Sequence, residues 1–380
     1  MTTGGRASRP LVSFVVPCYK HGHFLVECVQ SILGQTYQNV EVLIMDDCSP
    51  DDTPAIAQTL RDPRIRYIRN DVNLGHLRNY NKGISLALGE YVWLINVDDY
   101  LRRTYVLDRF VTTLERNPAA AFVFCPAVQV HGRDEGAVFG LHGDTDAVFT
   151  GPAFLERLLV RNCVATPAVM VRKASYDQMG MFPLDLPYAG DWYQWCRHAF
   201  YGSVAYLAEP MVCYRIHELN MTKDYFERPA AVISDEVTVR WRAKQTAEGL
   251  GLTPVVRAAL RGIAHDYGVR VAQRVADRSK FGLTFEEFEA SLAANCTSAD
   301  EKRRITATVL AALGDHYYHQ GETAEARQYY RRALQQNPAD LRTLVKGGLL
   351  ATGAVGRALR SAATQLPGLI SPPLSLKRHS

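Results

Sequence analysis

The first 130 residues alternate between two hydrophobic periods. Short apolar runs bounded by polar or turn residues are separated by stretches in which apolar residues recur at helical spacing. The short runs predict strands over 11–16, 40–45, 65–70, 91–96 and 121–130. The stretches between them predict helices over 25–34, 53–60, 77–88 and 107–117.

This order of elements predicts an α/β fold. Strands that alternate with helices form a mostly parallel sheet with helices on both faces. The runs Val12–Val16 and Val40–Met45 are almost continuously apolar, as expected of strands that are buried on both sides. Between residues 132 and 219 the hydrophobic pattern indicates loops and short elements, and from Phe226 onward it is almost wholly helical.

One helical stretch, residues 310–338, resembles a tetratricopeptide repeat. Its small and aromatic residues fall at the positions of that helix-hairpin motif: Gly314, Tyr317, Gly321, Ala326, Tyr330, Ala333 and Pro338. A second copy that starts near Gly348 is degraded. Because such repeats bury their faces against stacked neighbours, we expect this hairpin to pack on the preceding helices.

Composition narrows the class of protein. With 380 residues, 47% of them apolar, the chain is long enough for a large core. The net charge of +4 and the absence of a Lys/Arg block interleaved with aromatics argue against a nucleic-acid partner. The eight cysteines show no C-x-x-C spacing and are expected to be reduced core thiols. No signal core or transmembrane segment is evident, which favours a cytoplasmic protein.

Polar residues gather directly after three of the predicted strands. They are Pro17 and Tyr19, then Asp46 and Asp47, and then Asn96, Asp98 and Asp99. In an open parallel sheet, ligands bind outside the carboxyl ends of the strands. Acids that gather at one edge are the ligands expected for a divalent cation, which a nucleoside diphosphate would need. Taken singly, these acids could also be turn residues or helix caps, and Tyr19 could be an ordinary half-buried aromatic.

Four segments in order, 12–19, 42–53, 73–83 and 89–99, resemble the family-2 glycosyltransferases. The resemblance covers roughly residues 11–220. It implies a GT-A fold, a nucleotide-sugar donor, Mn²⁺ or Mg²⁺ as cofactor, and inversion at the anomeric carbon. It further implies a glycosyltransferase domain over 11–225, with a nucleotide-sugar-binding half (11–130) and an acceptor half (131–225). We expect a disordered N-terminus over 1–10, a helical region over 226–365 and a flexible tail over 366–380.

The resemblance also implies individual roles. Nucleotide binding falls to Pro17, Tyr19, Asp46, Asp47, Lys82, Asp98 and Arg215, with Asp47 on the base and Asp98 on the ribose or phosphate side. Metal binding falls to Asp99, and His217 of the Arg-x-His segment could approach the metal or the phosphates. For Arg215 and His217 a purely structural role is equally consistent with the sequence.

The stretch from Gly190 to Arg197 resembles the family segment that places a general base at the start of a helix. Asp191 is its one acid and therefore the candidate catalytic base. Asp191 could instead cap a helix that buries Trp192 and Trp195, and both roles are compatible because a helix N-terminus favours an ionised carboxylate.

Two positions depart from the family pattern. Asn96 replaces an acid before the metal-binding pair, and Tyr80 stands where an arginine is frequent. Positive charge for the phosphates would then come from Lys82, Arg78 or Arg215.

The sequence thus predicts transfer of a sugar, favouring a UDP-sugar, to an acceptor hydroxyl in bacterial cell-surface polysaccharide or glycan synthesis. The acceptor would be a glycan or a lipid-linked molecule, and the helical region could bind a protein partner or bring the enzyme to the inner membrane. Alternatives are an inactive GT-A scaffold that recruits partners, and a nucleotidyltransferase, which would need a basic glycine-rich loop after the first strand. Four residues of the acceptor half suit sugar stacking or packing equally well: Phe139, His142, Phe149 and Tyr188.

Overall fold

The computed structural model describes residues 9–220, 228–277, 282–296, 298–340, 343, 344 and 347. The chain divides into two compact units, residues 1–225 with 246–255 and residues 226–245 with 256–380. The expectations for residues 1–8, for the degraded second repeat near Gly348 and for the tail over 366–380 lie outside the described residues.

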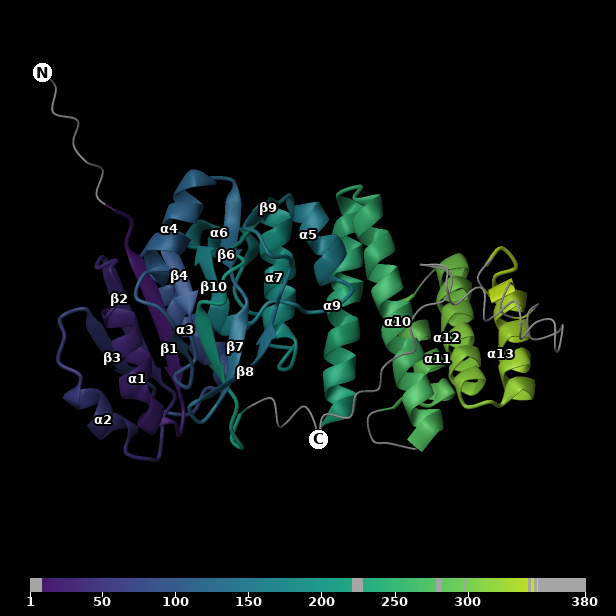
Figure 1. Cartoon of the computed structure of the whole chain (residues 1–380), viewed down its shortest axis with the longest axis horizontal. Coiled ribbons are helices and arrows are strands. Elements are labelled where there is room, and N and C mark those ends of the chain that lie inside the picture. The colour runs from purple at the N-terminus through teal and green to yellow at the C-terminus, as the bar shows by residue number, and fades with distance from the viewer. Residues whose placement is uncertain are drawn as a thin grey trace, which may run out of the picture. The chain divides into compact units, whose positions relative to one another are not determined.

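The first unit is built on an eight-stranded sheet with the order β3-β2-β1-β4-β10-β6-β11-β9 (Figure 1). Its strands are β1 (Val12–Cys18), β2 (Val40–Asp46), β3 (Ile65–Arg69), β4 (Tyr91–Leu94), β6 (Ala120–Phe124), β9 (Ala147–Phe149), β10 (Val169–Arg172) and β11 (Ser203–Tyr206). Strands β3, β2, β1 and β4 pair in parallel, and β10 runs antiparallel between β4 and β6. The predicted α/β fold with a mostly parallel sheet is confirmed.

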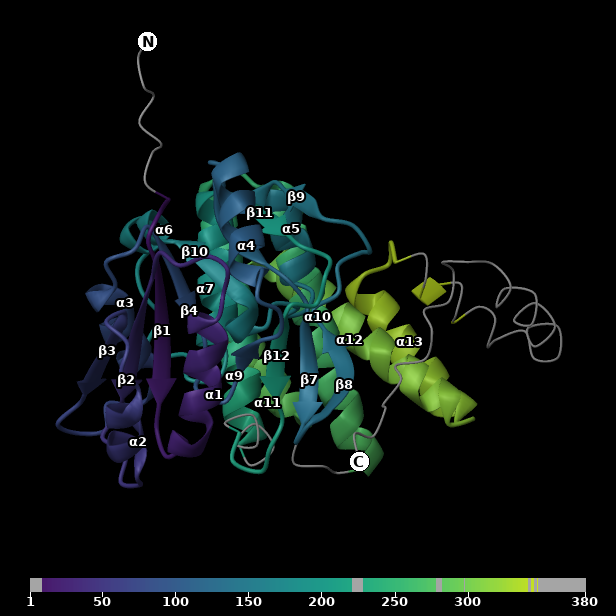
Figure 2. The ribbon, with the colours of Figure 1, turned by 60° about the vertical axis from the view of Figure 1, so that its left-hand side comes forward.

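Helices cover both faces of this sheet. Successive side chains of a strand point to opposite faces, so the apolar strands have side chains to bury on each face. Phe14 of β1 stacks on Trp93 of β4 at 5.4 Å between ring centroids, in the cluster that also contains residues of α1 (Gly22–Leu33) and α4 (Val106–Arg116). The next residue, Val15, meets α3 (His76–Leu86) on the other face, where a Cβ on Gly83 would lie 2.4 Å from Val15 Cγ1. Gly83 therefore allows the close approach of α3 to the sheet (Figure 2).

The first unit also contains a smaller four-stranded sheet, with the order β5-β12-β7-β8, whose first strand comes directly after β4 in the chain. Its strands are β5 (Tyr100–Leu101), β7 (Ala127–His131), β8 (Asp134–Phe139) and β12 (Val212–Arg215). The single strand predicted over 121–130 is wrong, because β6 and β7 belong to different sheets. The break falls at Cys125 and Pro126, where proline has no N–H to donate to a ladder.

The remaining elements of the first unit lie around these sheets. They are α2 (Thr53–Thr59), α5 (Gly151–Leu158), the short 3-10 helix η1 (Thr166–Ala168), α6 (Lys173–Met179) and α7 (Gly190–Tyr201). All eight cysteines are free, as the sequence predicts.

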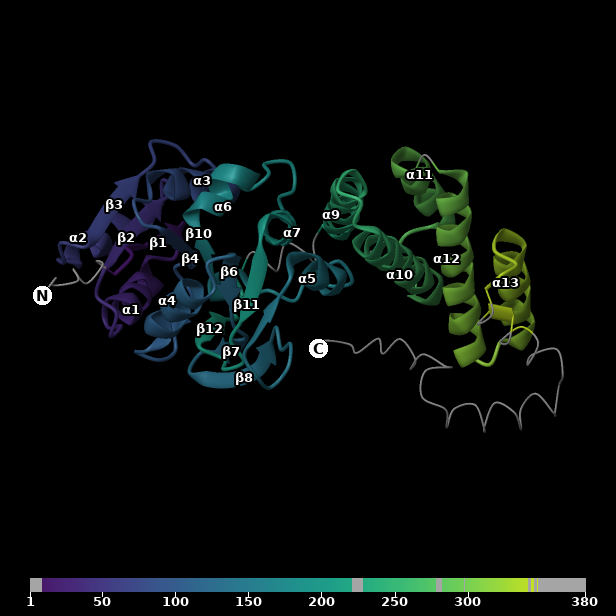
Figure 3. The same cartoon turned by 90° about the horizontal axis from the view of Figure 1, so that it is seen from above.

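The second unit consists of helices in its described part (Figure 3). They are α9 (Pro229–Gly249), α10 (Thr253–Asp277), α11 (Phe285–Asn295), α12 (Ala299–His319) and α13 (Thr323–Gln336). Residues 246–255, which end α9 and begin α10, belong to the first unit. One core joins Trp241 of α9, Tyr267 of α10, Phe288 of α11 and Val309 of α12. Within the described residues, no helix is both long enough and apolar enough to span a bilayer.

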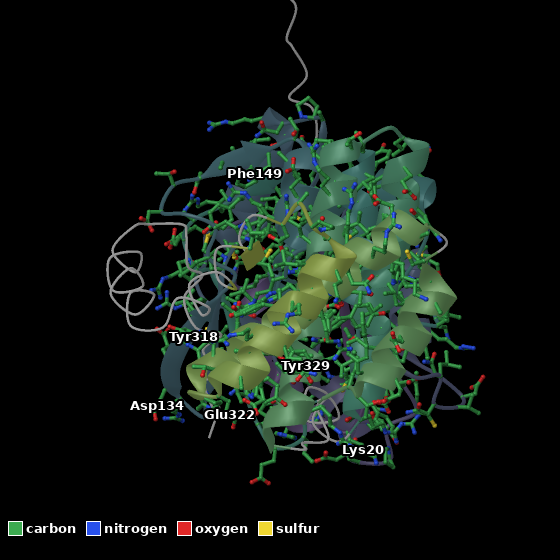
Figure 4. The ribbon with its side chains drawn as sticks, turned by 90° about the vertical axis from the view of Figure 1, so that its right-hand side faces the viewer. Lys20, Asp134, Phe149, Tyr318, Glu322 and Tyr329 are labelled. Carbon is green, nitrogen blue, oxygen red and sulfur yellow. The ribbon has the colours of Figure 1, made fainter. Side chains whose placement is uncertain are left out.

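Helices α12 and α13 form the predicted hairpin. Gly314 lets them approach, since a Cβ there would lie 2.6 Å from the ring of Tyr330, and Tyr330 Oη donates to Asp315 Oδ1 at 2.6 Å. Gly321 makes the turn between the helices at a φ of +84°, a conformation that favours glycine. Tyr318 of α12 and Tyr329 of α13 are labelled in Figure 4.

Candidate active site

The carboxyl ends of β1 and β2 and the segment after β4 open on a cavity of about 480 Å³. We call it the donor cavity, after the ligand that the family resemblance implies for this edge of the sheet. Four residues predicted to bind nucleotide line it: Pro17, Tyr19, Asp47 and Asp98. The volume falls in the range of ligand-binding pockets. The expectation that these strand ends lie together therefore agrees with the structure.

Asp47 is held at the wall of the donor cavity by three N–H donors. Asn70 Nδ2 and the backbone N of Leu74 donate to Oδ1, each at 2.8 Å, and the backbone N of Gly75 donates to Oδ2 at 2.9 Å. Oδ2 accepts only one of these three hydrogen bonds, so it can accept a further hydrogen bond from a ligand in the cavity.

Asp98 lies in the same cavity beside His217 and Asn220. His217 Nε2 lies 3.0 Å from Asp98 Oδ2, and Asn220 Nδ2 donates to the same oxygen at 3.2 Å. The backbone N of Leu219 donates to His217 Nδ1 at 3.2 Å, so a neutral His217 carries its proton on Nε2 and donates it to Asp98. His217 thus orients the Asp98 carboxylate.

Asp99 lies beneath the cavity and is only 1% exposed. Its Oδ1 accepts from the backbone N of Arg215 at 3.0 Å, and its Oδ2 is 3.5 Å from Asn96 Nδ2. Burial, together with the neighbouring Asp98 carboxylate, raises the pKa of Asp99 well above its usual range. Of the two adjacent acids, the structure turns Asp98 toward the cavity and Asp99 toward β12.

Two other predicted nucleotide ligands support the site from below. Asp46 is fully buried and accepts from Tyr67 Oη at 2.6 Å and from the backbone N of Ser49 at 2.8 Å. Lys82 Nζ donates to Asn70 Oδ1 at 2.6 Å, and so reaches Asp47 only through Asn70.

Arg215 is likewise engaged within the protein. Its Nε donates to the backbone O of Asp98 at 2.8 Å, and its Nη2 donates to Glu27 Oε2 at 2.5 Å. The guanidinium lies over the ring of Phe24, 4.6 Å from its centroid. Arg215 therefore fixes the Asp98 segment and is not among the residues that line the donor cavity.

Lys20 lines the donor cavity, although sequence reasoning did not select it. Its side chain is labelled in Figure 4. Its backbone adopts a φ of +61° and its N donates to Ser49 Oγ at 3.2 Å, which ties the turn after β1 to the turn after β2. Its Nζ lies 5.0 Å from the ring centroid of Tyr19. Lys20 directly follows the Pro17–Tyr19 motif, and this position could have identified it as a candidate site residue.

A second cavity, of about 340 Å³, adjoins the first. We call it the acceptor cavity, after the role that the family resemblance implies for Asp191. Asp191 lines it, and both cavities share His76, Tyr80, Asn96 and Tyr214. The two cavities are therefore parts of one cleft.

Asp191 lies in the first turn of α7, and the residue that caps this helix is Ala189. The interpretation of Asp191 as the N-cap is therefore wrong. Its Oδ2 accepts from Thr166 Oγ1 at 2.9 Å and its Oδ1 from the backbone N of Trp192 at 2.6 Å. Burial raises the pKa of Asp191, while these hydrogen bonds lower it, and burial is the larger effect.

Residues 13–175 match the model of glycosyl transferase family 2. This segment is a family-2 glycosyltransferase domain. The match contains β1 to β4 with the turns that line the donor cavity. Residues 307–340 match the tetratricopeptide repeat model, which confirms the repeat predicted over 310–338.

Relatives of the family-2 domain agree with this assignment. An uncharacterized glycosyltransferase of Haemophilus influenzae is 28% identical over 215 residues, which are 55% of this chain and 66% of the relative. The succinoglycan biosynthesis protein ExoO of Rhizobium meliloti is 39% identical over 111 residues, 29% of this chain and 31% of the relative. The chain thus spans less than two thirds of the length of these curated relatives.

The fold is similar to that of S. aureus TarS residues 1–349, solved in complex with UDP-GlcNAc. The TM-score is 0.52 at 14% sequence identity, and the comparison covers 92% of each chain. The likeness confirms the GT-A fold followed by a helical region.

The two departures of the family-2 domain from its pattern meet in the cleft. Tyr80 Oη donates to Asn96 Oδ1 at 3.1 Å, and both residues line both cavities. The Tyr80 ring packs edge-on against His76 and Phe182. Burial raises the pKa of Tyr80, so its phenol stays protonated at neutral pH and acts as a donor.

The four acceptor-half aromatics separate into two groups. Phe139 and Tyr188 line the acceptor cavity. His142 and Phe149 pack with Phe154, at 5.6 and 5.9 Å between ring centroids. The first pair is thus placed to contact a ligand, and the second pair supports the fold.

Proposed function

We propose that the chain is an inverting glycosyltransferase that moves a sugar from a nucleotide-sugar to an acceptor hydroxyl. The observation that carries this proposal is the single cleft in which the Asp47 and Asp98 cavity meets the Asp191 cavity. One cavity suits a nucleoside diphosphate, the other holds a carboxylate positioned as a base, and the transferred sugar would lie where they join.

On the donor side, Asp47 accepts an N–H of the base with its Oδ2, and Tyr19, which is 39% exposed, lies beside the nucleoside. Lys20 is the positive side chain that lines this cavity in the described part of the chain, so we assign to it the phosphate role expected of Lys82, Arg78 or Arg215. The UDP-GlcNAc complex of TarS supports a UDP-sugar as the donor class.

Residues of the donor cavity fit a divalent cation. Asp98 offers a hard carboxylate oxygen next to the His217 imidazole and the Asn220 amide, and we propose Asp98 in place of Asp99 as the metal ligand, with His217 beside it. Among the described residues no group of three His, Cys, Asp or Glu forms a complete site, so diphosphate oxygens would supply the remaining ligands. Mn²⁺ or Mg²⁺ bound there would offset the charge of the leaving diphosphate.

On the acceptor side, Asp191 takes the proton of the acceptor hydroxyl. The hydroxyl oxygen then forms a bond to the anomeric carbon on the face opposite the diphosphate. The bond from that carbon to the phosphate oxygen breaks with its electron pair, which inverts the configuration. Thr166 and the Trp192 N–H hold the carboxylate for this step.

A change at Thr166 should move the pH dependence of transfer. Asp191 must be ionised to accept a proton, so the rate falls as the pH drops through its pKa, which burial holds above the usual Asp value. The Thr166 hydroxyl favours the ionised form, so Thr166→Val raises this pKa and shifts the acid limb of kcat to higher pH. Thr308→Val, which removes a hydroxyl bonded to the backbone O of Arg304 in α12, is the control. An unmoved acid limb in Thr166→Val would contradict the role of Asp191.

The relatives and the helical unit support a class of pathway and a class of partner. The similarity to a succinoglycan biosynthesis protein supports a place in bacterial polysaccharide synthesis, with a glycan or lipid-linked acceptor. The tetratricopeptide hairpin over 307–340 supports a protein partner. We place the enzyme in the cytoplasm, where nucleotide-sugars are made, with its acceptor bringing it to the inner membrane.

Thermal unfolding tests the donor site. We expect one of UDP, GDP, dTDP and CDP to raise Tm, and to do so only with Mn²⁺ or Mg²⁺. At about a hundred times its Kd, the nucleotide should add roughly 2.7 kcal/mol to the free energy of unfolding. If no nucleotide shifts Tm with either metal, the alternative of a non-catalytic scaffold is favoured.

A further inference from the structure

The walls of the acceptor cavity combine aromatic rings with neutral polar groups. Phe139 and Tyr188 contribute aromatic rings to the lining, and Gln129, Asn162 and Thr166 contribute amides and a hydroxyl. No lysine or arginine is among the described residues that line this cavity. Apolar ring faces with a few neutral donors and acceptors match the alternating C–H and O–H groups of a sugar ring.

The two halves of the cleft therefore differ in charge. Lys20 lines the donor cavity and can face a phosphate, whereas Asp191 is the one charged side chain in the described lining of the acceptor cavity. Arg161 precedes Asn162 in the chain, but it is exposed and lies outside that lining. His76 does not supply a cation at neutral pH, because burial lowers its pKa.

An anionic acceptor would meet this environment without a counter-charge. A phosphate or carboxylate near Asp191 would be repelled, and the repulsion is strengthened where water is partly excluded. Its burial without a positive partner would add a desolvation cost. A neutral hydroxyl meets neither penalty.

We propose that the acceptor group bound in this cavity is an uncharged sugar ring, and that the cavity rejects rings that carry a phosphate or a carboxylate. This inference rests on the proposed function, and it restricts the acceptor to glycans or lipid-linked saccharides whose terminal sugar is neutral.

The test measures binding of small glycosides to the full chain in the presence of Mn²⁺ and the nucleotide selected by thermal unfolding. The probes are the methyl glycosides of glucose, galactose, mannose and N-acetylglucosamine, compared with methyl glucuronide, methyl galacturonide, glucose 6-phosphate and mannose 6-phosphate. Ligand-detected NMR gives the Kd values. We expect at least one neutral glycoside to bind about tenfold or more tightly than its charged counterpart, a difference that one unscreened like-charge contact can supply.

A charge placed in the cavity should change this preference. Gln129→Lys adds a cation to the acceptor lining and should reduce the neutral-over-anionic ratio by about tenfold. Gln335→Lys adds the same charge on the exposed face of α13 and should leave the ratio unchanged. Asn162→Lys provides a second variant in the lining if Gln129→Lys does not fold.

The outcomes separate this inference from the proposed function. Nucleotide binding without any neutral glycoside bound, or with charged sugars bound equally well or better, overturns the neutral-acceptor inference and leaves the donor site standing. If the unmodified chain instead shows no metal-dependent nucleotide binding, the proposed function is overturned. An equal effect of both lysine variants would show that the preference arises from general charge and not from this cavity.

Discussion

Asp191→Asn should lower glycosyl transfer by about 10²- to 10⁴-fold, the range typical of a lost general base. Asn keeps the shape of the side chain, and its oxygen can still accept from Thr166, so the fold should be retained. The amide cannot take the proton of the acceptor hydroxyl. Because Asp191 lies outside the donor cavity lining, the Kd of the nucleotide should stay within about twofold of the unmodified protein.

The matched control is Asp177→Asn, which makes the same change on the exposed face of α6. Transfer is followed as release of nucleoside diphosphate, and nucleotide binding by calorimetry. Near-normal transfer by Asp191→Asn would remove this residue from the reaction. A large loss of nucleotide binding would instead show that Asp191 acts on the donor.

Asp98→Asn should remove the metal dependence of nucleotide binding, while Asp99→Asn should retain it. Asp98 lines the donor cavity with a carboxylate oxygen beside His217, whereas Asp99 is buried against the backbone of Arg215. We expect Mn²⁺ to tighten nucleotide binding about a hundredfold in the unmodified protein and in Asp99→Asn, and less than about threefold in Asp98→Asn.

The two variants control for each other because they differ by one position in the chain. The measurement is the Kd of the nucleotide with Mn²⁺ and with a chelator, accompanied by the free energy of unfolding of each variant. The reverse result, with metal dependence lost in Asp99→Asn alone, would restore the assignment that the family resemblance implies.

Much of the nucleotide half could be predicted from sequence because local patterns determine it. The apolar runs at Val12–Val16 and Val40–Met45 favour strands that are buried on both sides, and residues that directly follow such strands lie at one edge of a parallel sheet. Pro17, Tyr19, Asp47 and Asp98 were found on this basis, and all four line the donor cavity.

The remaining assignments depended on contacts between distant parts of the chain. Whether Asp98 or Asp99 faces the cavity is decided by β12, whose Arg215 backbone N–H binds Asp99 from 116 residues away. Lys82 carries a charge suited to phosphate, but its Nζ donates a hydrogen bond to Asn70 Oδ1. Charge and motif position predict which residues gather near the cleft, but not which of them line its cavities.

The acceptor half was harder to predict because packing and recognition use the same residue types. Phe139 and Phe149 are equivalent in the sequence pattern, but Phe149 packs on Phe154 and Phe139 lines the cavity. The break between β6 and β7 was missed because apolar residues continue on both sides of Pro126. Proline was the local signal for that break.

The proposed function requires this cleft to transfer a sugar. The most direct measurement incubates the full chain with UDP-, GDP-, dTDP- and CDP-sugars, Mn²⁺ and neutral glycoside acceptors, and records nucleoside diphosphate release together with the mass of the acceptor. We predict release with one donor class, dependent on the metal, and an acceptor that gains the mass of one glycosyl residue. A folded protein that binds its nucleotide but transfers no sugar to any acceptor, and releases no diphosphate, would contradict the claim.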